Sequence, residues 1–399
     1  MDCRPPLCPP TFLLSPMTAS IAALQSSFST GGPAAALAEL TSRLTQEKKH
    51  HELFEALKLQ VRHQLGLPLL PVESNSDELS EATRNQLEDG LVDACRQVGE
   101  LLLADGKVRE GWMYLRPVGD RAAAARLINT VEANDDNTEE LIEVLLHEGV
   151  DTGRGFELLL KQNGTCNAIT TYDQMLHQRS RKEQQAAAAP LLERLYADLV
   201  SNVKHDIARQ ESTQPSQTTL QELVADRDWL FQDSAYHIDT THLASVMRIA
   251  KVLEQPRQLQ MALDLTHYGR HLTPQLQYQG DEPFVDQYPS HALYYQALLG
   301  ENVEEAVSYF ENKARLLDPQ YNGTTAIETY LQLLSRIGRH QEAIAAAVSL
   351  MPEGAPYVAY GPVLMELSAK AGDYRPMLDF CQTRGDELGY AAALVASKA

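Results

Sequence analysis

Apolar residues recur every three to four positions along most of this chain, which is the spacing of one face of an α-helix. In the stretch 51–65, for example, this face carries Leu53, Leu57 and Val61. The strict alternation of apolar and polar residues that marks β-strands is almost absent. The pattern therefore predicts an all-α protein.

Turns made of glycine, proline and small polar residues separate the expected helices. In the first half, we expect helices at 34–44, 51–65, 77–102, 108–115, 122–131, 139–147 and 156–162, and a long one after Pro190. In the second half, we expect helices at 219–231, 240–254, 257–268, 290–299, 303–316, 324–337, 340–350, 358–371 and 375–396.

A glycine follows several of these helices directly, and a short polar turn then leads into the next helix. The clearest copies surround Gly338 and Gly372, and looser copies surround Gly300 and Gly106. Glycine adopts the left-handed conformation of a helix end without the penalty that a Cβ atom brings. Because Gly300, Gly338 and Gly372 are 38 and 34 residues apart, the spacing predicts stacked helical hairpins.

The segment 324–350 resembles a tetratricopeptide repeat, in which Gly338 ends the first helix and Ala343 is the small residue at the helix contact. Looser resemblances cover 290–319 and 358–381, and an N-terminal unit has Gly99, Gly106 and Gly111 in matching places. The resemblance implies an α-α superhelix, which is a solenoid of TPR-like helical hairpins. A generic bundle of α-hairpins is the alternative.

Composition divides the chain into four segments. Residues 1–20 are proline-rich and are expected to form a disordered leader, with Met17 as an alternative start. Residues 21–208 are expected to form an N-terminal helical-repeat region, and 219–399 a C-terminal TPR-like region. Between them, 209–218 contains no apolar residue and is the expected linker.

Net charge indicates which partners are disfavoured, and cysteine content indicates a cellular location. The chain has 54 acidic and 34 basic residues, a formal charge of −20, which disfavours nucleic acid. A single echo of a pentatricopeptide unit at 167–173 does not outweigh this charge. No apolar run approaches the ~20 residues that cross a bilayer. Five scattered cysteines without a paired motif favour a cytoplasmic location.

Four histidines suggest a metal site. His267 and His271 are four residues apart, the spacing that places two imidazoles on one helical face. His237 lies just before the preceding expected helix and His242 lies inside it, and that helix would form an antiparallel hairpin with the helix of His267. Two features favour a packing role instead. Gly269 is expected to end the helix before His271, and His267 continues an apolar stripe.

Other candidate residues are aromatic or nucleophilic. Trp112, Tyr114 and Arg116 near a Pro-Gly turn, and the pair Tyr294 and Tyr295, are typical of interface anchors and equally of helix packing. Cys166 is expected on a loop, without an identifiable base. The phosphate-binding, dinucleotide, metalloprotease and serine-hydrolase motifs that we sought are not present.

These observations predict a non-enzymatic protein–protein interaction scaffold that needs no cofactor. It would bind a peptide or partner helix in a groove formed by the first helices of its hairpins. The negative charge favours a basic partner, and neither nucleic acid nor a membrane is expected. The alternative is a helical enzyme or a metal-binding protein that uses the histidine cluster.

Overall fold

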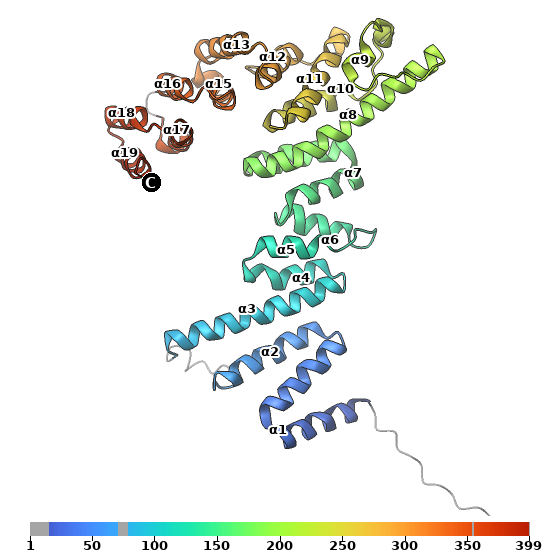
Figure 1. The fold of residues 1–399 in the computed structure, drawn as a ribbon, viewed down its shortest axis with the longest axis vertical. Coiled ribbons are helices and arrows are strands. Elements are labelled where there is room, and N and C mark those ends of the chain that lie inside the picture. The colour runs from blue at the N-terminus through green and yellow to red at the C-terminus, as the bar shows by residue number, and fades with distance from the viewer. Residues whose placement is uncertain (1–15, 71–78, 353–354, 399) are drawn as a thin grey trace, which may run out of the picture. The chain divides into compact units, whose positions relative to one another are not determined.

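The computed structural model describes residues 16–70, 79–352 and 355–398. Within these ranges the regular elements are helices, and no residue lies in a strand (Figure 1). Consecutive helices pack against one another in chain order, which is the arrangement of a helical-hairpin solenoid. The fold class predicted from the apolar periodicity, all-α with stacked hairpins, is thereby confirmed.

The chain forms two compact units, Met1–Leu158 and Leu159–Ala399. The division lies within helix α7 (Thr152–Met175), shortly before Gly164 interrupts the helical backbone with φ 78°. The expected linker, 209–218, includes the last three residues of α8 (Arg181–Glu211) and is otherwise without helix.

Most helices of the first unit lie where we expected them. The helices of this unit are α1 (Pro16–Gln46), α2 (His50–Gln64), α3 (Glu81–Ala104), α4 (Val108–Leu115), α5 (Arg121–Ile128), α6 (Thr138–Ile142) and the start of α7. Helices α1 and α7 are much longer than the expected helices 34–44 and 156–162. A 3₁₀ turn, Arg116–Val118, follows α4 at the expected proline, and a π-helical turn, Glu143–His147, extends α6. Of the expected leader, 1–15 lies outside the described residues and 16–20 belongs to α1.

Helices α3 and α4 approach each other closely at two glycines. A Cβ atom on Gly111 would lie 2.8 Å from the Leu103 side chain and 3.1 Å from the carbonyl oxygen of Gly99. A Cβ atom on Gly99 would likewise lie 2.7 Å from Leu115 and 3.1 Å from the carbonyl oxygen of Gly111. Gly111 is therefore the small residue at the contact between α3 and α4.

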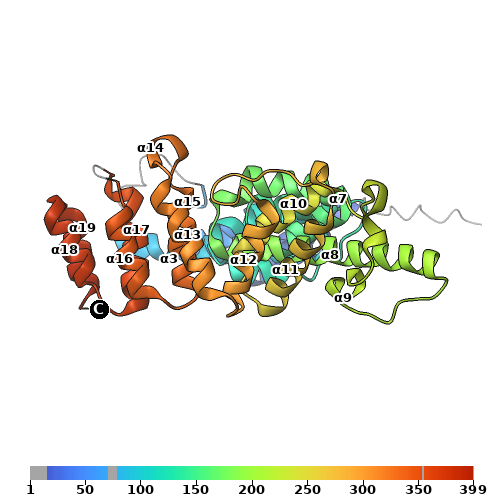
Figure 2. The same ribbon diagram turned by 90° about the horizontal axis from the view of Figure 1, so that it is seen from above.

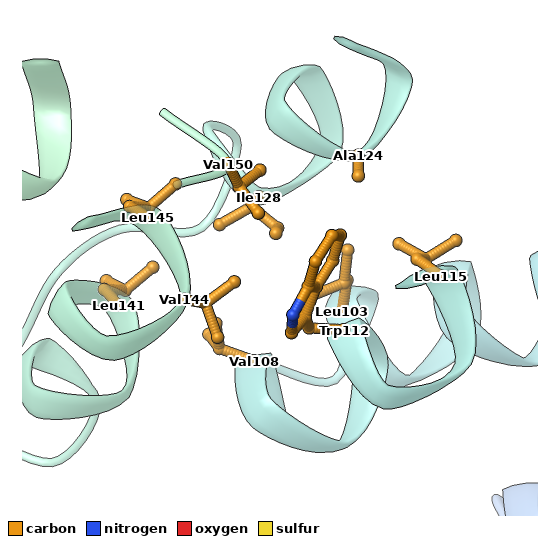
Figure 3. Close-up of a cluster of buried hydrophobic side chains, with 10 residues drawn as sticks. All are labelled: Leu103, Val108, Trp112, Leu115, Ala124, Ile128, Leu141, Val144, Leu145 and Val150. Carbon is orange, nitrogen blue, oxygen red and sulfur yellow. The ribbon is translucent and has the colours of Figure 1, made fainter. Parts of the chain in front are cut away.

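The core of the first unit surrounds Trp112, as Figure 3 shows. The indole lies among aliphatic side chains from α3 to α6 and the turns between them. These are Leu103, Val108, Leu115, Ala124, Ile128, Leu141, Val144, Leu145 and Val150. A second cluster joins α1, α2 and α3 through Leu44, Leu53, Ala56, Val98 and Leu102. Each hairpin thus covers the apolar face of the next one along the chain.

The second unit begins with the end of α7 and the long helix α8. The next helical elements are α9 (Leu220–Val224), a 3₁₀ segment (Asp228–Ser234), α10 (Thr240–Ile249), a 3₁₀ turn (Ala250–Val252) and α11 (Pro256–His271). Hairpins then follow, built from α12 (Gln287–Leu298), α13 (Val303–Leu316), α14 (Pro319–Asn322), α15 (Thr325–Arg336), α16 (His340–Leu350), α17 (Tyr357–Ala371), α18 (Arg375–Arg384) and α19 (Glu387–Ala396). Figure 2 shows α13 and α15 to α18 as successive neighbours.

The turn glycines adopt the conformation that the sequence pattern predicts. Gly106, Gly300, Gly338 and Gly372 have φ values of 78°, 86°, 82° and 66°, which is the left-handed region open to glycine. We expected one helix over 375–396, but Gly385, with φ 67°, divides it into α18 and α19. The side chain of Asp386 then caps α19 by accepting a hydrogen bond from the amide of Gly389.

Candidate functional site

A hollow of about 520 Å³ lies between α15 and α17 in the second unit. We call it the α15–α17 groove. Its lining comprises Arg181, Thr324, Ile327, Glu328, Leu331, Gln332, Ser335, Met351, Pro352, Ala355, Val358, Ala359, Val363, Glu366 and Leu367. Helices α15 and α17 are the first helices of consecutive hairpins, and α16 packs against both (Figure 2).

The floor of the groove is apolar because of residue spacing on both helices. Ile327 and Leu331 are four residues apart on α15, and Val363 and Leu367 are four apart on α17, so each pair lies on one face. The apolar surface extends to Val358, whose side chain is 78% exposed. Apolar residues on several sides of α17 indicate a helix with more than one contact surface.

Two arginines hold the walls of the groove in place. Arg336, at the end of α15, donates hydrogen bonds to the backbone carbonyls of Lys251 and Leu253. Arg384, at the end of α18, donates to the carbonyls of Met351 and Pro352 at 3.0 and 3.1 Å, and these two residues line the groove. Arg336 thus ties the end of α15 to the segment 251–253, and Arg384 ties α18 to the segment at 351–352 that lines the groove.

The polar residues of the lining are mostly occupied by other side chains. Arg181 lies 3.1 Å from Glu254, and Glu366 lies 2.7 Å from Lys370. Lys370 also donates to Ser335 at 3.2 Å.

Two polar lining residues keep free binding capacity. Glu328 accepts a hydrogen bond from the Thr324 hydroxyl at 2.7 Å, and no cation of the described chain pairs with it. Gln332 is exposed and makes no hydrogen bond within the described ranges. The groove therefore offers an apolar floor, one unpaired carboxylate and one free amide.

The chemistry of this lining suits docking. It contains no histidine or cysteine, so it provides no nucleophile–base pair of the usual kind. Its apolar floor and few polar groups are typical of surfaces that bind part of another molecule by burial and orient it by a small number of polar contacts.

The four candidate metal-ligating histidines do not converge on one point. His267 and His271 line one hollow with Gln221, whereas His237 lines another with His205. His242 belongs to the first turn of α10 and lines neither hollow. The described residues contain no group of three or more histidine, cysteine or acidic side chains that could hold a metal ion.

The predicted helix break at Gly269 is wrong, because α11 continues to His271. A Cβ atom on Gly269 would lie 2.1 Å from the Tyr288 ring. This glycine therefore leaves space for an aromatic side chain and does not end the helix. The two histidines therefore do share a helical turn, and the Nδ1 atom of His271 lies 2.9 Å from the carbonyl oxygen of His267. The ring of His271 stacks on Phe231.

Burial lowers the pKa of two of these histidines. His237 is affected despite the carboxylate of Asp206, which lies 3.4 Å from its Nε2 atom and opposes the shift. Its Nδ1 atom lies 2.9 Å from the Tyr268 hydroxyl. His267 is affected mainly by burial too. Burial therefore disfavours the protonated form of both imidazoles.

The aromatic candidates have different surroundings. Trp112, Tyr294 and Tyr295 are 6%, 1% and 0% exposed, and the Tyr295 hydroxyl donates to the carbonyl of Met247. Tyr114 is half-buried, with its hydroxyl 2.9 Å from the Nδ1 atom of His51. Arg116 is exposed and lies 3.8 Å from Glu148. Because three of the five are buried in their own hairpins, we do not build the candidate site on them, and their role as partner anchors stays a prediction.

Cys166 lies in helix α7, two residues after the interruption at Gly164, and not on a loop as expected. Its side chain is exposed and forms no disulfide. We expected this helix to end at 162 and missed that it resumes after Gly164 and continues to Met175.

No protein-family model, curated protein or solved structure matches this chain. None of the described helices combines the length and the apolarity needed to cross a membrane. Any function proposed for this chain must therefore be inferred from its own residues.

The groove residues Val358, Val363 and Glu328 were not singled out from sequence, although the first helices were expected to form the binding surface. The available signal was helix 358–371, whose apolar residues exceed what one buried face requires. Which of them remain exposed depends on how α16 and α18 cover the helix, and that is a tertiary property.

Proposed function

We propose that this chain is a non-enzymatic protein–protein interaction scaffold, and that the α15–α17 groove binds a peptide or helix of a partner protein. The observation that carries the proposal is a hollow with a mainly apolar lining between the first helices of two consecutive hairpins, with Val358 78% exposed at its edge. Exposed apolar surface of this kind is commonly a contact site for another molecule.

Three further features support the proposal. The resemblance of 324–350 to a tetratricopeptide repeat favours an interaction role by analogy alone. The charge of −20 favours a basic partner, because complementary charge speeds encounter. Five scattered cysteines favour a cytoplasmic location, which we propose together with the function.

The proposal predicts that a charge at the groove weakens peptide binding. A random peptide display library would be selected on the full chain, and the enriched peptides measured by fluorescence polarisation. Val358→Glu is expected to weaken binding of groove ligands at least tenfold, because it places a carboxylate on the apolar surface.

Val395→Glu on α19 is the matched control, since Val395 is 72% exposed and lies outside the groove. Both variants should have the circular dichroism spectrum and melting temperature of the parent, because both positions are solvent-exposed. If no enriched peptide distinguishes Val358→Glu from Val395→Glu, the groove is not the binding site and the proposed function fails.

A further inference from the structure

The α15–α17 groove is long relative to a single side chain. Its lining on α15 runs from Thr324 to Ser335, which corresponds to about 16 Å at about 1.5 Å per helical residue. The floor residues Ile327 and Leu331, like Val363 and Leu367, repeat every four residues, or about 6 Å. A ligand therefore needs at least two apolar side chains about 6 Å apart to fill it.

The hydrogen-bonding capacity of the lining decides between an extended and a helical ligand. An extended peptide would bring unpaired backbone amide and carbonyl groups against the apolar floor, and each such group needs a partner. Of the polar lining residues, Arg181, Ser335 and Glu366 already pair with other side chains. Gln332 and Glu328 alone cannot satisfy a strand of backbone, whereas a helix satisfies its own backbone groups.

A carboxylate at the rim of the groove determines which polar side chain of the ligand is favoured. Glu328 is an exposed carboxylate whose recorded partner is the Thr324 hydroxyl, and no cation of the described chain pairs with it. It lies beside the floor residue Ile327. A lysine or arginine next to an apolar anchor would therefore meet a free carboxylate at the edge of the groove.

We propose that the ligand of the α15–α17 groove is an amphipathic α-helix with apolar anchors at positions i and i+4 and a lysine or arginine that pairs with Glu328. This inference rests on the proposed function and specifies the partner at the same site. The helix is a segment of another protein, laid with its apolar face on Ile327, Leu331, Val363 and Leu367.

The test uses the peptides that lose binding to Val358→Glu in the display selection on the full chain. Their sequences are expected to repeat apolar residues at i and i+4, with a basic residue beside one anchor. Substituting proline at a central position should weaken binding more than tenfold, because it breaks the helix. Glu328→Gln, which keeps the shape of the side chain, should weaken binding about two- to fivefold, as expected for an exposed ion pair.

A peptide whose basic residue is replaced by a neutral one completes the test. Replacing its basic residue by glutamine should weaken binding to the parent chain by the same factor, and should have little further effect on Glu328→Gln. Anchors at i and i+2, or tolerance of the central proline, would show an extended ligand and overturn the inference. Equal binding to parent and Glu328→Gln would overturn the ion pair. In these cases the groove still binds peptide, so the proposed function stands.

Discussion

The ammonium group of Lys251 lies 4.1 Å from the centre of the Phe284 ring, and no carboxylate of the described chain pairs with it. His291 stacks on the same ring at 4.1 Å and is 2% exposed. Burial, reinforced by Arg248, lowers the pKa of Lys251 to about 8. Burial, reinforced by Lys251, lowers the pKa of His291 to about 3. Packing at this point therefore disfavours positive charge.

The lowered pKa of Lys251 predicts a pH dependence of stability. Between about pH 8 and 10.5, the unfolded chain keeps the proton that the folded chain has released, so this residue makes stability rise with pH. Below pH 8 both states hold the proton, and the cost of the buried charge is fully present. Lys251→Met keeps the aliphatic stem without the charge.

We expect Lys251→Met to be more stable than the parent at pH 7 and to lose this advantage by pH 10.5. Urea unfolding at both pH values measures the two differences, with Lys370→Met, whose ammonium is exposed on α17, as the control. A stability difference that does not change with pH would contradict the assigned cause.

At the scale of elements, close contacts between helices depend on residues that have no side chain. Helices α3 and α4 meet at Gly99 and Gly111, where each Cβ atom would lie 3.1 Å from the opposite carbonyl oxygen. The same principle explains Gly269, which faces Tyr288. A glycine inside a helix can thus indicate that a neighbouring helix or side chain packs closely against it.

Gly111→Ala tests this contact. Alanine favours an isolated helix by about 1 kcal/mol over glycine, but the added Cβ atom would overlap Leu103 and the backbone of Gly99. Because such overpacking costs about 1–3 kcal/mol, we expect a net loss of stability of about 1 kcal/mol in chemical denaturation. Met113→Ala on the same helix, at a position 56% exposed, should change stability by less than about 0.5 kcal/mol. A stabilised Gly111→Ala would show that α3 and α4 can separate without cost.

At the scale of the whole molecule, stability arises locally because helices pack mainly on neighbours in sequence. The first unit relies on the cluster around Trp112. The second unit contains a buried carboxylate, Asp264, which accepts hydrogen bonds from the Tyr196 hydroxyl at 2.9 Å and from Gln260 at 3.0 Å. The bond from Tyr196 joins α8 to α11, whereas Gln260 lies in α11 itself.

Amide hydrogen exchange should therefore reveal two independently perturbed units. Gly111→Ala is expected to speed exchange within 81–158 and to leave 219–398 unchanged. Asp264→Ala leaves the Tyr196 hydroxyl without its acceptor, at a cost of about 1–3 kcal/mol, and should speed exchange in α8 and α11 alone. Equal acceleration along the whole chain in both variants would instead indicate a single cooperative unit.

Most helices were predictable from sequence because their signals are local. Apolar periodicity, the proline after α4 and the left-handed glycines at 106, 300, 338 and 372 each act within a few residues. The break at Gly385 and the continuity at Gly269 were not predictable, because the same residue type ends one helix and lets a tyrosine pack on another. The difference lies in segments distant in sequence.

By itself, the sequence determined the all-α fold, the order of the hairpins and the formal charge of −20. Only the tertiary structure decided which apolar residues stay exposed, such as Val358, and that Trp112, Tyr294 and Tyr295 are buried. It also decided that the four histidines do not converge on one point and that Glu328 keeps an unpaired carboxylate. The physical reason is that periodicity tells which face of a helix is apolar, whereas the neighbouring helices determine how much of that face is covered.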